Sequence, residues 1–238
     1  MCTVTIVPVV DGFRLGCNRD ERRDRPLAWP PAVHGLPHRT AIFPVDPTGL
    51  GTWVGVNDTR LAAALLNRST DSTVPLDKNR LRSRGLIIPG LLDCASLTEA
   101  LHLGAALDPR DFDRFRLVMV QRGTIATLTS DGAELAVELA GLTRPIMLTS
   151  SLLGEAWVEG PRRLLFERFF AGEERSWVRA QSRFHQHQWR RRRDISVRME
   201  RADAQTVSHA FVSVTGSAIE LRYRALESEE VAVVMAAC

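Results

Sequence analysis

The fold is decided by the first 21 residues of the chain, MCTVTIVPVVDGFRLGCNRDE (residues 1–21). β-Branched residues dominate 2–9, and Asp11-Gly12 is a strong turn signal between two β-rich segments. This pattern predicts a hairpin with strands over 2–9 and 12–17, whose second strand ends in the polar residues 18–21. Pairing of the two strands around a turn at residues 10–12 brings residues 18–20 close to Cys2.

Turn residues and hydrophobic periodicity predict the remaining elements. Six prolines lie in residues 24–50, which are therefore expected to form an irregular loop. Further strands are expected over 52–57, 60–67, 115–121, 123–129, 133–138, 145–150, 206–214, 217–224 and 230–235. Helices are expected over 80–94 with a kink or break at Pro89, over 96–107 with Ser96 as N-cap, from Pro161 onward, and over 174–189.

The grouping of these elements indicates the fold class. Strands occur in hairpins at both ends of the chain, with helical pairs between them. This order favours antiparallel sheets with helices packed on their outer faces over strict alternation of strands and helices. Residues 1–238 are expected to form one domain.

The composition is that of an ordinary globular protein, with 45% hydrophobic and 25% charged residues. The net charge is only +3, and Lys78 is the only lysine, so the basic character comes from arginine. Such a bias is more typical of a GC-rich genome than of a protein that binds nucleic acid. No nucleic-acid partner is therefore expected. No stretch approaches the roughly 20 apolar residues that cross a bilayer, and the start is not that of a secretory signal. A cytoplasmic protein without a membrane span is expected.

No metal or other cofactor is predicted. The four cysteines lack Cys-x-x-Cys spacing, which argues against a disulfide framework and a zinc ribbon; they are Cys2, Cys17, Cys94 and Cys238. His185 and His187 lie two residues apart before four arginines, but no third metal ligand is evident. The segment is more typical of the basic end of a helix.

Cys2 carries the chemistry that the sequence suggests. Removal of the initiator methionine would leave a thiol and a free α-amine on one residue. The α-amine has an ordinary pKa of about 7.7–8.0, so it can act as the base for its own side chain. Asp20 could hold the α-ammonium, and Arg19 could favour the thiolate or bind a substrate carboxylate. The alternatives are that Cys2 is a small buried strand residue and that the polar cluster is a solvated turn.

A set of motifs supports the first interpretation. They are Met1-Cys2, Asn18-Arg19-Asp20-Glu21, Gly51-Thr52-Trp53-Val54-Gly55-Val56, Leu66-Asn67-Arg68, Ser83-Arg84-Gly85 and the later stretch Asp203–Ser208. In this order they resemble the NRDE family, also called the transport and Golgi organisation two family. The resemblance covers the first 90 residues well and the middle of the chain poorly.

The resemblance implies an α+β fold, the four-layer αββα sandwich of N-terminal-nucleophile hydrolases. It identifies Cys2 as nucleophile, Asp20 as the nearby carboxylate and Asn67 as an oxyanion donor. Asn18, Arg19 and Trp53 are the corresponding substrate-binding candidates. The cysteine amidases of this group place an arginine immediately before the asparagine of the second strand, whereas here the arginine follows it. Neighbours on a strand face opposite sides, so the role of Arg19 stays open.

Two functions are therefore expected as alternatives. The first is a cysteine N-terminal-nucleophile hydrolase or acyltransferase acting on a small amide, ester or thioester substrate. The second is a non-catalytic carrier of haem or an acyl-CoA-like ligand, although the chain has neither a Cys-Pro nor a Cys-x-x-Cys-His motif. Ser150-Ser151, after the strand expected near 145–150, could also line the cleft. The sequence does not predict an oligomeric state.

Overall fold

The computed structural model describes residues 2–69, 76–151, 153–216 and 218–237, and its strands form two antiparallel sheets. Sheet A has the spatial strand order β10-β1-β2-β11-β12-β13; these are Ile146–Thr149 (β10), Cys2–Val9 (β1), Gly12–Arg22 (β2), Ala204–Val214 (β11), Ala218–Ala225 (β12) and Glu230–Ala236 (β13). Sheet B follows the chain order from β3 to β9; these are Trp29–Gly35 (β3), Thr40–Val45 (β4), Val54–Asn57 (β5), Ala62–Asn67 (β6), Phe115–Gln121 (β7), Thr124–Ser130 (β8) and Leu135–Gly141 (β9).

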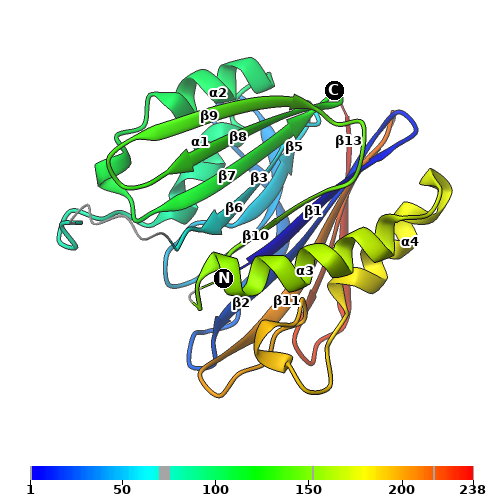
Figure 1. Ribbon diagram of the computed structural model, residues 1–238. Coiled ribbons are helices and arrows are strands. Elements are labelled where there is room, and N and C mark those ends of the chain that lie inside the picture. The colour runs from blue at the N-terminus through cyan, green and yellow to red at the C-terminus, as the bar shows by residue number, and fades with distance from the viewer. Residues whose placement is uncertain (1, 70–75, 152, 217, 238) are drawn as a thin grey trace.

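Helices cover the outer faces of both sheets (Figure 1). Helices α1 (Ile87–Leu92) and α2 (Leu97–Ala105) pack on sheet B, and α3 (Glu155–Phe170) and α4 (Glu174–His185) pack on sheet A. Short 3-10 turns are formed by Arg84–Leu86, Pro109–Asp111 and Arg193–Ile195. The expected α+β sandwich of four layers, αββα, is confirmed. Within the described residues no helix is long and apolar enough to cross a membrane.

Side chains that alternate along each strand of sheet B pack into two different hydrophobic clusters, one on each face of the sheet. In β6, Ala62 and Ala64 belong to the cluster between the sheets, whereas Ala63 and Leu65 belong to the cluster beneath α1 and α2. Successive side chains of a strand point to opposite faces, so the continuous run of buried apolar residues in β6 shows that sheet B is covered on both faces there. The outer face of sheet A differs, because threonines, Asn18 and other polar side chains are buried there under α3 and α4.

The N-terminal hairpin forms as predicted, with Asp11 in the left-handed region at φ 57°. Its register pairs Cys2 with Arg19 and Val9 with Gly12, so the polar motif does lie beside Cys2. However, β2 continues to Arg22 instead of ending at residue 17. The reason is that β11 pairs with β2 along its whole length, which satisfies the backbone of the polar residues as well.

The proline-rich segment is not an irregular loop, because it contains β3 and β4. Strand β3 lies at the edge of sheet B, where Pro30 and Pro31 fall at an irregularity in the pairing. Pro44 lies in β4 beyond the residues that pair with β5. Each proline therefore occupies a position where a missing N–H is tolerated.

Three helix predictions need correction. The helix expected over 80–94 is reduced to a 3-10 turn and α1, and Pro89 lies in the first turn of α1, where its N–H would have no helical partner. Helix α3 begins at Glu155, so Pro161 lies inside it. Helix α4 ends at His185, four residues early. The N-cap of α2 is as predicted: Ser96 Oγ accepts a hydrogen bond from the N–H of Glu99.

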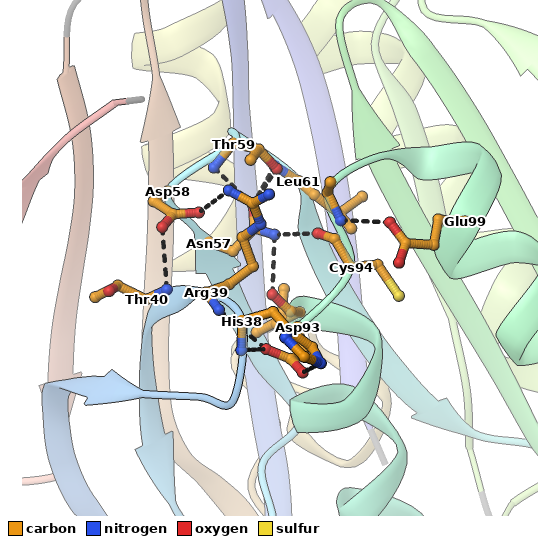
Figure 2. Close-up of polar contacts among 12 residues, drawn as sticks. His38, Arg39, Thr40, Asn57, Asp58, Thr59, Leu61, Asp93, Cys94 and Glu99 are labelled. Carbon is orange, nitrogen blue, oxygen red and sulfur yellow. Dashed lines mark hydrogen bonds and ion pairs between the residues drawn. The ribbon is translucent and has the colours of Figure 1, made fainter.

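Asn57 fixes α1 to sheet B (Figure 2). Its buried side-chain amide donates to the carbonyls of Leu92 at 2.9 Å and Cys94 at 2.8 Å. Its carbonyl oxygen accepts from the N–H groups of Thr59 at 3.1 Å and Leu61 at 2.9 Å. The amide thus ties the end of α1 to the β5–β6 turn.

Candidate active site

A cavity of about 280 Å³ lies where the N-terminal hairpin of sheet A meets β5 and β6 of sheet B. Five of the six site residues predicted from the sequence line it, namely Cys2, Arg19, Asp20, Trp53 and Asn67. The two sheets bring these residues together from positions up to 65 apart in the sequence.

Ser150 forms hydrogen bonds with both the nitrogen and the carbonyl oxygen of Cys2. The nitrogen of Cys2 donates to Ser150 Oγ at 3.1 Å, and the Ser150 N–H donates to the Cys2 carbonyl at 3.0 Å. Ser150 follows directly after β10, which pairs with β1. The candidate nucleophile is therefore fixed by an edge strand on one side and by β2 on the other.

Neighbouring groups lower the pKa of the Cys2 thiol to about 7. The largest cause is a hydrogen bond with the Cys17 thiol; burial opposes the shift, and the positive charge of Arg19 supports it. The pKa of Cys17 is raised well above its ordinary value by the same hydrogen bond and by burial. The Cys17 sulfur is also 3.8 Å from the Asn18 carbonyl, but a thiolate is the stronger acceptor for its single proton. Cys17 thus acts as the donor that stabilises a Cys2 thiolate.

This difference predicts selective alkylation. Because the thiolate is the reactive species, Cys2 should react with iodoacetamide with a rate that rises through pH 7, whereas Cys17 and Cys94 should react more slowly. Burial raises the pKa of Cys94 to about 11. Peptide mapping after brief labelling between pH 5 and pH 9 measures the three rates. Equal labelling of the three thiols at pH 7, or an inflection for Cys2 near the ordinary value of about 8.5, would contradict the assignment.

Arg19 faces into the cavity and is fixed there. Its guanidinium lies over the Trp53 ring, 4.5 Å from the centroid, and its Nη2 is 2.8 Å from Asp46 Oδ2. Asp46 also binds Arg25 at 2.6 Å. Burial acts to raise the pKa of Asp46, but hydrogen bonds from Arg25 and Thr48 and the charge of Arg19 hold it below its ordinary value. Arg19 is therefore a rigid, paired cation beside Cys2.

Asp20 faces the opposite side of β2 from Arg19 but still reaches the cavity at the end of the sheet. Its Oδ1 accepts a hydrogen bond from Thr206 Oγ1 at 2.5 Å. Burial raises the pKa of Asp20, and the charge of Arg162 opposes that rise.

Arg162 of α3 is buried between α3 and sheet A, with 1% of its surface exposed. Its guanidinium donates to Thr3 Oγ1 at 2.8 Å, Thr149 Oγ1 at 2.7 Å, and the carbonyls of Ile195 at 3.0 Å and Ser196 at 2.6 Å. It joins β1, β10 and the segment after α4 next to Cys2 and Asp20. Burial lowers its pKa, and the nearby acidic charges oppose that shift.

Asn18 is the one predicted substrate-binding residue that does not line the cavity. Its side chain lies on the outer face of sheet A, because it alternates with Arg19. Its amide nitrogen donates to the carbonyls of His185 and Val197, both at 2.9 Å. Its oxygen contacts the Nδ1 atoms of His185 at 2.7 Å and His209 at 2.9 Å. Asn18 therefore binds α4 and β11 to β2 and lies outside this cavity.

Other cationic groups line the cavity from the segment before α1. Arg84 is largely buried, donates to the Arg114 carbonyl at 2.9 Å and lies 3.3 Å from Asp113. Arg82 is exposed, lies over the Phe112 ring at 5.5 Å and has no acidic partner among the described residues. Asn67, at the end of β6, completes this side of the cavity.

The sequence does not reveal the roles of several of these residues. Ser150-Ser151 is expected only as a possible lining of the cleft, which does not predict the hydrogen bonds between Ser150 and Cys2. Arg84 belongs to a motif of the family resemblance, but no pattern distinguishes it from its neighbours. Asp46 lies in the proline-rich segment that was predicted to be a loop. Arg162 is one of many arginines in the chain, and only the packing of α3 on sheet A identifies it as buried.

No group of three potential metal-ligating side chains occurs in the parts of the chain that the structure describes. His185 is fully buried and contacts Thr5 Oγ1 at 2.7 Å, so it belongs to the packing of α4. Burial also lowers the pKa of His185 well below its ordinary value, which keeps the ring neutral.

Comparison with known proteins identifies a family and a set of similar folds. The sequence profile of the family described as Transport and Golgi organisation 2 matches residues 3–167. Among solved structures, an N-acylethanolamine-hydrolysing acid amidase ortholog from Caenorhabditis elegans is similar with a TM-score of 0.56 and 14% identity, over 88% of this chain and 92% of that one. Penicillin V acylase from Agrobacterium tumefaciens is similar with a TM-score of 0.58 and 11% identity, over 99% and 86%.

A C2A mutant of conjugated bile acid hydrolase from Clostridium perfringens gives a TM-score of 0.56 with 12% identity, over 99% of this chain and 92% of that one. At these identities the likeness is one of fold. No protein of curated function matches the sequence significantly.

Proposed function

We propose that this chain, which belongs to the Transport and Golgi organisation 2 family, hydrolyses or transfers an acyl group with Cys2 as its nucleophile. The observation that carries the proposal is the setting of Cys2. Its thiol lines the cavity with a pKa lowered to about 7, and its nitrogen is bound to Ser150 at the same site. The fold supports the proposal, because the similar structures are an amidase, an acylase and a bile acid hydrolase.

The reaction requires Cys2 to become the first residue, so that the nitrogen at Ser150 is a free α-amine. This amine accepts the thiol proton, and the resulting thiolate attacks the acyl carbonyl. The tetrahedral intermediate then expels the leaving amine, alcohol or thiol, which takes the proton back from the α-ammonium, and a thioester on Cys2 remains. Water attacks the thioester in hydrolysis, and a second nucleophile attacks it in transfer.

Three neighbours have proposed roles in these steps. Asp20 orients the α-ammonium with its carboxylate, itself held by Thr206 and the charge of Arg162. Asn67 donates to the oxyanion from the opposite sheet. Arg19, held by Trp53 and Asp46, stabilises the thiolate before attack. The charges lie at fixed positions before substrate arrives, as electrostatic catalysis requires.

A carrier function in the same cavity is the second candidate, and Arg82 is the observation that favours it. An exposed guanidinium without an acidic partner among the described residues suits a ligand with an anionic group, such as a phosphate of acyl-CoA or a propionate of haem. The volume of about 280 Å³ is at the lower end of the range for small-molecule pockets, which fits an acyl head group better than a whole haem.

The experiment that separates the two functions uses the protein with Met1 removed, confirmed by intact mass. It is incubated with a panel of N-acyl amides, p-nitrophenyl esters and acyl thioesters, and in parallel its bound ligands are identified by native mass spectrometry. Steady turnover of one acyl class supports the enzyme. Stoichiometric binding of acyl-CoA or haem, with no turnover across the panel, would contradict the enzyme function and support the carrier function.

A further inference from the structure

The outer surface of α3 has a chemical character that the cavity does not explain. Trp157, Pro161, Leu164 and Arg168 are spaced four, three and four residues apart, so they form one stripe along the helix. Helix α3 belongs to the outermost layer on the sheet A side (Figure 1). Trp157 and Leu164 are 59% and 61% exposed, whereas the face of the same helix that packs on sheet A buries Val158 and Arg162.

A groove follows this stripe. It has a volume of about 490 Å³ and lies between α3 and the segment after α4. Its lining combines five apolar residues, Pro161, Leu164, Leu165, Trp189 and Ile195, with four arginines, Arg168, Arg190, Arg191 and Arg192.

The four arginines that line the groove have no acidic partner in the part of the chain that the structure describes. Nearby arginines are paired there, because Arg193 binds Glu200 and Arg163 binds Glu159. Arg192 lies over the Trp157 ring, 5.3 Å from its centroid, which joins the run of arginines to the apolar stripe. The groove therefore complements a partner that is both anionic and apolar.

We propose that this basic apolar groove docks the protein on an anionic lipid bilayer. An apolar helix stripe flanked by arginines is the profile of an interfacial helix, and tryptophan favours the boundary between head groups and acyl chains. Each arginine near an anionic surface strengthens the attraction. Leu164 and Trp157 add to binding only where an apolar layer, such as lipid acyl chains, lies beneath the charged head groups. A nucleic acid would use the arginines but would leave Leu164 and Pro161 without apolar partners.

The test measures binding of the full chain to sedimented vesicles of phosphatidylcholine, with and without about 30% phosphatidylglycerol. We expect binding to the anionic vesicles only, weakened at least tenfold when salt rises from about 0.1 M to about 1 M, because the screening length falls from about 10 Å to about 3 Å. Replacement of Arg190, Arg191 and Arg192 by glutamine should weaken binding roughly 100-fold. Replacement of Trp157 and Leu164 by alanine should weaken it roughly tenfold.

The matched control removes the same charge elsewhere, by replacing the exposed Arg122, Arg144 and Arg179 with glutamine. This variant should bind within threefold of the unmodified protein, and all variants should keep its melting temperature. Equal loss of binding in the control, or no binding to anionic vesicles, would overturn the proposal. Tighter binding to a single-stranded RNA than to the vesicles would also overturn it, if replacement of Arg190, Arg191 and Arg192 abolished that RNA binding.

Discussion

Cys2→Ala is expected to lower acyl turnover by on the order of 10⁴-fold or more, because Cys2 is the only thiol among the described residues that line the cavity, and it forms the covalent intermediate. The same change should alter stability little. It removes one sulfur from a position at the edge of the interior, which costs about 1 kcal/mol and a few degrees in melting temperature. Activity on the substrate found by screening, measured beside thermal unfolding, checks both parts.

Cys94→Ala is the matched control for that variant. Cys94 is also a buried thiol, but it lies at the end of α1 and does not line the cavity. Its replacement should cost a similar amount of stability and leave turnover unchanged. Undiminished turnover in Cys2→Ala would rule out the nucleophile, whereas a large loss of stability in that variant alone would indicate that Cys2 is ordinary core packing.

Arg162→Met is expected to destabilise the protein by about 3–5 kcal/mol, equivalent to a fall in melting temperature of roughly 10 °C. The substitution keeps the bulk of the side chain but removes four hydrogen bonds, leaving the carbonyls of Ile195 and Ser196 buried without their donor. It also removes the cation that faces Asp20. The cost is large because each group left behind has lost its water and gains no new partner.

The neighbouring residue provides the control for this prediction. Arg163 lies one position along the same helix, but it is exposed and pairs only with Glu159. Arg163→Met should therefore change stability by less than about 1 kcal/mol. Chemical denaturation of the two variants gives the comparison. Equal midpoints for both would mean that the buried network around Arg162 does not support the fold.

The hairpin and the position of Cys2 could be predicted from sequence, because they depend on local signals. Asp11-Gly12 sets the turn, the turn sets the register, and the register puts Arg19 opposite Cys2. The approach of Trp53 and Asn67 depends on stacking of two sheets, which no local pattern encodes; the resemblance to a family supplied it.

The placements that the sequence does not predict depend on contacts between distant elements. Asn18 points away from the cavity because it alternates with Arg19 along β2, and α4 packs on that outer face, where it contacts the Asn18 side chain. Strands β3 and β4 were hidden by prolines that are harmless only at an edge or outside the paired residues. Ser150 binds the backbone of Cys2 only because β10 pairs with β1. The two residues are 148 positions apart in the sequence.

The most direct test of Cys2 as the N-terminal nucleophile is the site of acylation by an activated ester. The protein with Met1 removed is mixed with a p-nitrophenyl ester and quenched in acid within seconds, which keeps the α-amine protonated and stops transfer of the acyl group from sulfur to nitrogen. Peptide mapping by mass spectrometry then locates the added group. We expect one acyl group, labile to hydroxylamine, on the peptide that begins with Cys2, and none on Cys17 or Cys94. Acylation spread over several residues, or absent from Cys2, would contradict it.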